Sequence, residues 1–280
     1  MTPPPARAPL PELWTDAPVA LWRTGLGFIL FALFYVAFSA VWFLAMPQPQ
    51  DPQGLTLTML GSFIVAILAV ALMMRTLHQR PLVRLIGTPD IALRQGLRCF
   101  GAVMLMLGLV WMMPLPRDLT PIRYMSLPDW ARLLPLALPL LMIQVSAEEL
   151  LFRGYLQSRL AARFASPAIW ALLPSVLFGA LHFQSSAGDN GWLFVLTATV
   201  FGLAAADLTR RSGTLGPAIA LHLANNIFGV LLLALPDGLG GLALFHLPVA
   251  SADPALRPFI PIDLATTLVL WLTARLVLRR

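Results

Sequence analysis

The sequence predicts an all-α fold, a polytopic membrane bundle of about eight transmembrane helices, because apolar stretches near the 20 residues needed to span a bilayer recur along it. Its composition agrees, since 58% of the residues are hydrophobic and 11% are charged, whereas soluble domains average about 25% charged residues. Proline-rich connections such as PQPQDPQG, PLPRDLTP and SADPALRP separate several of these stretches. An integral membrane protein is therefore expected.

The predicted helices divide the chain into a short tail and one membrane domain. They lie at residues 23–46, 55–74, 95–113, 130–152 with a helical continuation, 168–184, 191–208, 214–235 and 260–278. The start, MTPPPARAPLPELWTDAP, is rich in proline and has no basic segment leading into a short apolar core. Residues 1–20 are therefore predicted to be a disordered cytoplasmic tail, and residues 21–280 a single transmembrane helical domain.

The positive charges predict the orientation of the helices. All nineteen basic residues are arginine. With a cytoplasmic N-terminus, all but Arg117, Arg123, Arg132 and Arg257 fall on or toward the cytoplasmic side, as the positive-inside rule requires. Both termini are thus expected in the cytoplasm. The exclusive use of arginine is typical of GC-rich bacterial genomes, so the bacterial inner membrane is the expected location.

The distribution of the arginines also indicates which binding partners to expect. The arginines are spread over loops and helix ends and form no single patch, so nucleic acid is not an expected partner. The lipid bilayer is the expected surrounding, and the sequence does not indicate an oligomeric state. The single cysteine, Cys99, excludes an internal disulfide and a cysteine-rich zinc site.

Several polar side chains fall inside the predicted membrane helices, where each costs about 2.5–3.5 kcal/mol on insertion. They are Glu148, Glu149 and Arg153, then His182, then His222 and Asn226. Such residues usually face the interior of a bundle and often carry function.

The two adjacent glutamates are expected to have different roles. Glu149 and Arg153 are four residues apart in the order that lets a carboxylate meet a guanidinium on one helix face. Glu148 lies about 100° around the same helix and points to another neighbour. We therefore expect Glu149 to pair with Arg153 as support, and Glu148 to be free to act as a general base.

Helix depth decides which of these residues can meet. The helix containing Glu148 is predicted to continue to the break at Ser166, and His182 lies a similar distance beyond that break, so the two share a depth. His222 and Asn226 occupy one helix face but follow a cytoplasmic turn too closely to reach the same depth. Tilt, or a turn that sits below the membrane surface, would close this gap.

Two kinds of hydrolytic site fit these residues. Glu148, His182 and His222 resemble the ligands of zinc hydrolases, although HExxH is absent and separate helices would have to supply them. In a metal-free site, Glu148 takes a proton from water that His182 orients. His222 and Asn226 then donate to the oxyanion. Both alternatives, with and without zinc, remain open.

Three motifs occur in order on separate predicted helices. They are EExxxR at Glu148, Glu149 and Arg153, FxxxH at Phe178 and His182, and HxxxN at His222 and Asn226. Together they resemble the CPBP family of intramembrane proteases, which contains the type II CAAX prenyl endopeptidases and their bacterial Abi relatives. The resemblance covers about residues 130–235, which we take as the expected catalytic core.

The resemblance implies an intramembrane endopeptidase, of a family commonly labelled metalloproteases, that hydrolyses a peptide bond of a membrane-associated protein or peptide. It implies that Glu148 activates water, that His182 assists or binds metal, and that His222 with Asn226 stabilises the oxyanion or completes a metal site. CAAX processing is the eukaryotic activity. In a bacterium, peptide maturation, bacteriocin self-immunity or processing of a membrane partner is expected instead.

Other interpretations explain the same residues. Glu149–Arg153 can be a purely structural ion pair, Phe178 a packing residue, and the remaining polar groups hydrogen bonds between helices. The chain would then be a non-catalytic membrane scaffold or bacteriocin-immunity protein. A proton-coupled transporter would also place carboxylates and histidines in the membrane, but the sequence has no inverted repeat of the kind many transporters show.

Overall fold

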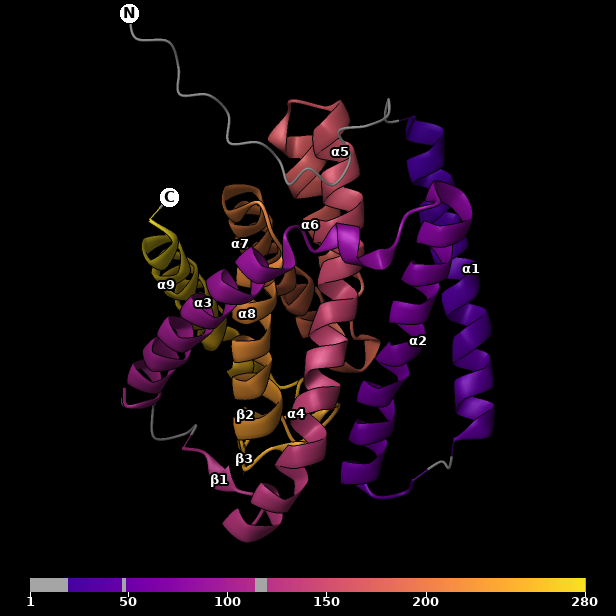
Figure 1. Cartoon of the computed structure of the whole chain (residues 1–280). Coiled ribbons are helices and arrows are strands. Elements are labelled where there is room, and N and C mark those ends of the chain that lie inside the picture. The colour runs from indigo at the N-terminus through magenta and orange to yellow at the C-terminus, as the bar shows by residue number, and fades with distance from the viewer. Residues whose placement is uncertain (1–19, 47–48, 114–119, 280) are drawn as a thin grey trace, which may run out of the picture.

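The computed structural model describes residues 20–46, 49–113 and 120–279, and they form a bundle of helices (Figure 1). The predicted helical membrane fold is confirmed. All but the last residue of the predicted tail, residues 1–20, lie outside the described residues.

The described helices follow the predicted segments in order. The α-helices are α1 Leu21–Ala45, α2 Pro52–His78, α3 Pro89–Trp111, α4 Leu127–Glu149, α5 Ser158–Arg163, α6 Leu173–Ala180, α7 Gly191–Ser212, α8 Gly216–Asn226 and α9 Ile260–Leu278. Three π-helical segments adjoin them, η4 Leu150–Gln157, η5 Ala168–Leu172 and η7 Ile227–Leu232. Short 3₁₀ turns include η2 Leu82–Leu85, η6 Ser185–Asn190, η8 Gly240–Leu242 and η9 Pro254–Phe259.

Not every predicted segment is a full membrane span. Among the described residues, six helices are long and apolar enough to cross a membrane, whereas Ala168–Ala180 and Gly216–Leu232 are shorter. The prediction of helix over 168–184 is wrong at its end, because α6 stops at Ala180 and His182 lies in the turn that follows. The prediction over 214–235 is also too long, since the helix stops at Leu232 and the chain becomes extended.

A small sheet closes one end of the bundle. Its strands are β1 Ile122–Arg123, β2 Leu233–Ala234 and β3 Phe245–His246. They lie in the order β1-β3-β2, with β1 antiparallel and β2 parallel to β3. Figure 1 places this sheet at the opposite end of the bundle from α5. Each strand has only two residues, too few to leave an alternating pattern in the sequence from which the sheet could be predicted.

The packing of α8 in the bundle determines where the functional residues of this helix lie. α8 packs on α3, and a Cβ added to Gly216 would overlap the carbonyl oxygen of Ala92. Glycine therefore lets the two backbones approach closely, as small residues do between membrane helices. The turn before α8 is buried too, with Thr214 3% and Leu215 0% exposed. α8 thus begins inside the bundle, which closes the depth gap left by the sequence analysis.

The ends of the outer helices bear on membrane orientation. In Figure 1 the start of α1 and the end of α9 lie in the upper half of the bundle, where α5 also lies. Both termini would then leave the domain on one side of a membrane. The arginine distribution predicts that this side is cytoplasmic.

Cysteine labelling in intact cells tests this orientation. Cys99 is fully buried, so it should give little background with a membrane-impermeant maleimide. We expect Ala252→Cys, at an exposed residue near the sheet, to be labelled from outside. Thr88→Cys, at an exposed residue between α2 and α3, should be labelled only after lysis. The reverse pattern would overturn the predicted orientation.

Candidate active site

A buried ion pair lies where α4 passes into η4. The Nη1 atom of Arg153 is 3.0 Å from Oε1 of Glu149, and the two side chains are 2% and 0% exposed. Arg153 belongs to the π-helical segment that starts directly after Glu149, and such segments are frequent at functional sites. The pairing expected from the four-residue spacing therefore forms, in full burial.

His222 on α8 meets both glutamates. Its Nδ1 lies 2.8 Å from Oε1 of Glu149 and donates to that carboxylate. Its Nε2 lies 3.5 Å from Oε2 of Glu148. The expected roles of the two glutamates therefore need an addition, because Glu149 contacts His222 as well as pairing with Arg153. This contact was not predicted, because counting residues from the preceding turn places His222 at a shallower depth than the glutamates.

A second contact joins α4 to α8 one turn away. The Nδ2 atom of Asn226 donates to Oε1 of Gln144 over 2.8 Å. Gln144 precedes Glu148 by one helical turn, and Asn226 follows His222 by one turn, so the facing helices are joined at two successive levels. Gln144 is a residue that the sequence analysis missed. Its signal in the sequence was an amide side chain within an apolar helix, four residues before Glu148.

Phe178 on α6 joins three of the polar groups. Its ring centroid lies 4.5 Å from Cζ of Arg153, within range of a cation–π contact. The same ring lies 4.6 Å from the ring of His182 and meets the ring of His222 edge-on at 5.9 Å. Phe178 therefore packs as expected, and it also helps to hold the charged network and both histidines in place.

His182 is fixed at the end of α6 by its own helix. Its Nδ1 lies 2.9 Å from the carbonyl oxygen of Phe178. Since a carbonyl only accepts, Nδ1 carries the hydrogen, and Nε2 of the neutral ring is left as an acceptor. Upstream, a Cβ added to Gly179 would overlap Oγ1 of Thr199 on α7. The close crossing of α6 and α7 thus sets the position of His182.

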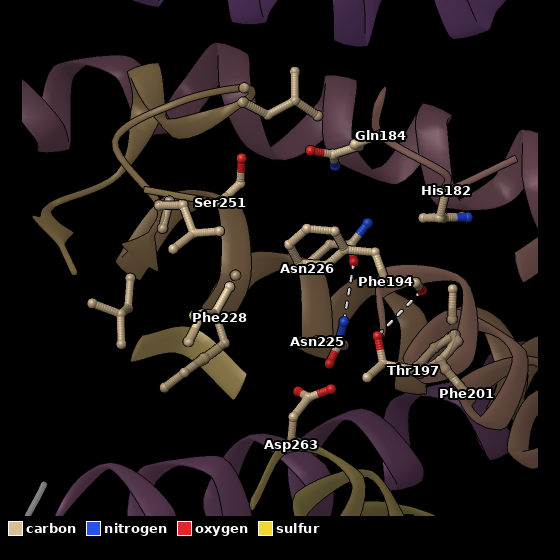
Figure 2. Close-up of a pocket in the computed structure, with 18 of the residues that line it drawn as sticks. His182, Gln184, Phe194, Thr197, Phe201, Asn225, Asn226, Phe228, Ser251 and Asp263 are labelled. Atoms are coloured by element: carbon tan, nitrogen blue, oxygen red, sulfur yellow. Dashed lines mark hydrogen bonds between the residues drawn. The ribbon is translucent and has the colours of Figure 1, made fainter. Parts of the chain in front are cut away.

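Some of these side chains line a cavity of about 510 Å³ (Figure 2). From the three motifs, its described lining includes Phe178, His182, His222 and Asn226, but not Glu148, Glu149 or Arg153. The remainder of the wall comes from α7, from η7 and the sheet region, and from α9. The volume is in the usual range for small-ligand sites, about 300–1,000 Å³. A short stretch of peptide would fit this space.

Glu148 lies beside the cavity wall rather than in it. Its side chain is 16% exposed, and its Oε2 is buried with no hydrogen-bond partner among the described residues. Glu149 Oε2 and Arg153 Nη2 are buried and unpaired in the same sense. Most buried polar atoms in folded proteins have a partner, so exceptions call for an explanation. Three of the six such atoms among the described residues belong to the EExxxR motif.

The donors named for the zinc alternative do not form a ready-made cluster among the described residues. Within the described ranges, no group of three His, Cys, Asp or Glu side chains lies close enough to hold a metal ion. Glu148 and His222 are near each other, and the Nδ1 hydrogen bond of His182 to its own helix leaves Nε2 as the nitrogen that would bind a metal. Zinc held by Glu148, His182 and His222 therefore stays a prediction, and the chemistry proposed for the site uses the side chains alone.

A comparison with known protein families matches the segment that contains these motifs. Residues 130–228 match the family described as "Type II CAAX prenyl endopeptidase Rce1-like". The matched segment contains all three motifs, so the resemblance inferred from them is confirmed, and the Rce1-like match supports a membrane protease. The matched segment runs from α4 to the start of η7 and leaves out α9.

A curated relative is similar over a longer stretch. The chain is 29% identical over 171 residues to "Uncharacterized protein YyaK" of Bacillus subtilis (strain 168). This match covers 59% of the chain and 57% of the relative, so the chain spans little more than half of that protein's length. No solved structure matches the chain.

Removing one partner of the buried pair should destabilise the fold strongly. Arg153→Met leaves Glu149 charged and buried, and breaking such pairs typically costs about 3–5 kcal/mol of unfolding free energy. Adding Glu149→Gln should recover part of that loss. Denaturation in detergent measures both variants. The control is Arg94→Met, which breaks an exposed pair with Asp90 and should cost about 1 kcal/mol or less. Equal losses at Arg153 and Arg94 would contradict the argument.

Proposed function

We propose that the chain is an intramembrane endopeptidase that hydrolyses a peptide bond of a membrane-associated protein or peptide. One observation carries the proposal. A buried carboxylate oxygen of Glu148 has no hydrogen-bond partner among the described residues and lies 3.5 Å from His222 Nε2, beside a cavity within the bundle. The Rce1-like match of this segment supports the same reaction class.

In the proposed reaction, Glu148 takes a proton from a water molecule, and the water oxygen attacks the carbonyl carbon of the scissile bond. His182 orients the water, because its Nε2 is free to accept a hydrogen bond. The tetrahedral intermediate then collapses, the C–N bond breaks, and the proton held by Glu148 passes to the leaving amine. The carboxylate of Glu148 is regenerated for the next turnover.

The oxyanion of the intermediate needs donors. Asn226 Nδ2 has two hydrogens, and only one is needed for its bond to Gln144, so the second can be donated. His222 donates through Nε2 when both ring nitrogens carry hydrogen, and its Nδ1 is then held by Glu149. In that state the imidazolium has a carboxylate near each nitrogen. Arg153 keeps Glu149 charged for this role.

The location and substrate class belong to the same proposal. The arginine distribution favours an orientation with both termini in the cytoplasm, and the exclusive use of arginine favours a bacterial inner membrane. In that orientation the sheet, which lies at the end opposite α5, faces the outer side of the membrane. Peptide maturation or processing of a membrane partner, of CAAX type or related, suits a cavity that is bordered by apolar side chains such as Phe194 and Phe228.

Cleavage of membrane-anchored peptides, prenylated and unprenylated, tests the reaction. We expect purified wild type in lipid to cleave a subset of a peptide library. Glu148→Gln should lower the rate about 10²–10⁴-fold, the usual contribution of a general base. Asp129→Asn, an exposed carboxylate at the other end of α4, is the matched control and should cleave normally. Metal analysis of the same samples shows whether cleavage follows metal content.

Other results of this experiment would favour other functions. Folded wild type that cleaves nothing would favour a scaffold or immunity protein. Proton-coupled flux in vesicles without cleavage would favour a transporter. Equal cleavage by wild type and Glu148→Gln would remove Glu148 from the reaction.

A second variant tests the donor role of Asn226. Gln144→Leu removes the acceptor that fixes the Asn226 amide, so we expect kcat to fall about tenfold or more with little change in KM. Asn226→Ala should then cost much less in the Gln144→Leu protein than in wild type, because the two residues act as a unit. Additive losses would show that Gln144 acts independently of Asn226.

A further inference from the structure

The cavity extends beyond the Rce1-like segment to α9, which contributes one acidic residue to its wall. Asp263 lies in the first turn of α9 and lines the cavity. Figure 2 shows its carboxylate pointing into the cavity toward Asn225 and away from His182 and Gln184. A carboxylate therefore faces the space in which the proposed substrate would lie.

Asp263 has no visible structural task in this position. No described residue forms a hydrogen bond or ion pair with its carboxylate, and the cavity lining contains no arginine. The other acidic residue of the lining, Asp237, is engaged, because its carboxylate accepts from the backbone N–H and the hydroxyl of Ser251. Of the two carboxylates, only that of Asp263 is left for a ligand.

Helix electrostatics explain part of this placement. A negative charge near the start of a helix is stabilised by about 0.3–1 kcal/mol, and Asp263 lies in the first turn of α9. That effect does not require the side chain to face a cavity. α9 is also a candidate membrane span, and charged residues in such helices usually mark a site for a substrate or ion.

We propose that Asp263 is the anchor of a subsite for a cationic side chain, lysine or arginine, of the bound peptide. The identity of the ligand as a peptide rests on the proposed protease function, whereas binding of a cation does not. Asn225 supplies a second acceptor. Its Nδ2 donates to Asn226, so its Oδ1 remains available to the same ammonium or guanidinium group.

The position of the subsite sets what it selects. Asn225 lies between Asp263 and Asn226, the proposed oxyanion donor, in Figure 2. A cation held by Asp263 would therefore belong to a residue close to the scissile bond. The subsite would select peptides with one basic residue at a fixed distance from the cleaved bond in an otherwise apolar sequence.

Binding to inactivated protein tests this subsite apart from catalysis. The probes are N-acetylated apolar decapeptides with a single lysine, norleucine or glutamate placed at each position in turn. They are titrated into the Glu148→Gln protein in lipid nanodiscs. We expect lysine at one or two positions to bind about threefold or more tighter than norleucine, because Asp263 is exposed in the structure and an ion pair of an exposed carboxylate contributes up to about 1 kcal/mol.

Two further variants test whether Asp263 causes the preference for lysine. Asp263→Asn in the same background should abolish the preference for lysine and retain binding of the norleucine peptides. Asp263→Arg should shift the preference to glutamate at the same positions, a gain that misfolding cannot produce. The control is Asp189→Asn, because Asp189 is 93% exposed and lies outside the described cavity lining. It should leave every affinity unchanged.

The outcomes separate this inference from the proposed function. Equal affinity for lysine and norleucine peptides, or no binding by any peptide, overturns the subsite. A lysine preference that survives Asp263→Asn also overturns it. A lysine preference lost in Asp263→Asn supports the subsite even if wild type cleaves nothing, in which case only the protease function fails. Cleavage by wild type without a lysine preference leaves the protease and removes the subsite.

Discussion

The arrangement of this bundle depends on the burial of charge among apolar helices. Glu149 and Arg153 are almost completely enclosed, and an unpaired charge in such surroundings costs several kcal/mol. Each must therefore find a partner on its own or a neighbouring helix. Glu149 is met by Arg153 and His222, and the guanidinium of Arg153 also meets the ring face of Phe178. These contacts oblige α4, α6 and α8 to converge at one level.

Convergence at that level requires backbones that approach closely. Glycine supplies the space at both critical crossings, Gly216 against Ala92 for α8 and Gly179 against Thr199 for α6. Both helices belong to the shorter segments of the bundle. A short helix can begin or end inside the bundle, so its polar residues reach the middle of the domain without the helix crossing the membrane. This explains why the motif histidines are found on or directly after the short helices.

The sequence was sufficient for the helices and for the pairs within one helix. Apolar length predicted the six described helices that are long enough to cross a membrane, but it also predicted two spans that are shorter. The four-residue spacing predicted the pairing of Glu149 with Arg153. Contacts between helices were harder to predict. The depth of a residue in the membrane was counted from the nearest loop, and this assumes that the loop lies at the membrane surface. The buried turn at Thr214 breaks that assumption. Gln144 went unnoticed because its task depends on the position of Asn226 on another helix.

The site combines two groups of residues that differ in how well they tolerate substitution. Glu149 is paired with both Arg153 and His222, so a substitution at any of the three leaves a buried partner with one contact fewer. Asp263 satisfies no described residue and can be replaced without leaving a partner unpaired. It also lies on α9, outside the Rce1-like segment. Under the proposed function, chains that share the matched segment can share a reaction while this wall of the cavity selects different peptides.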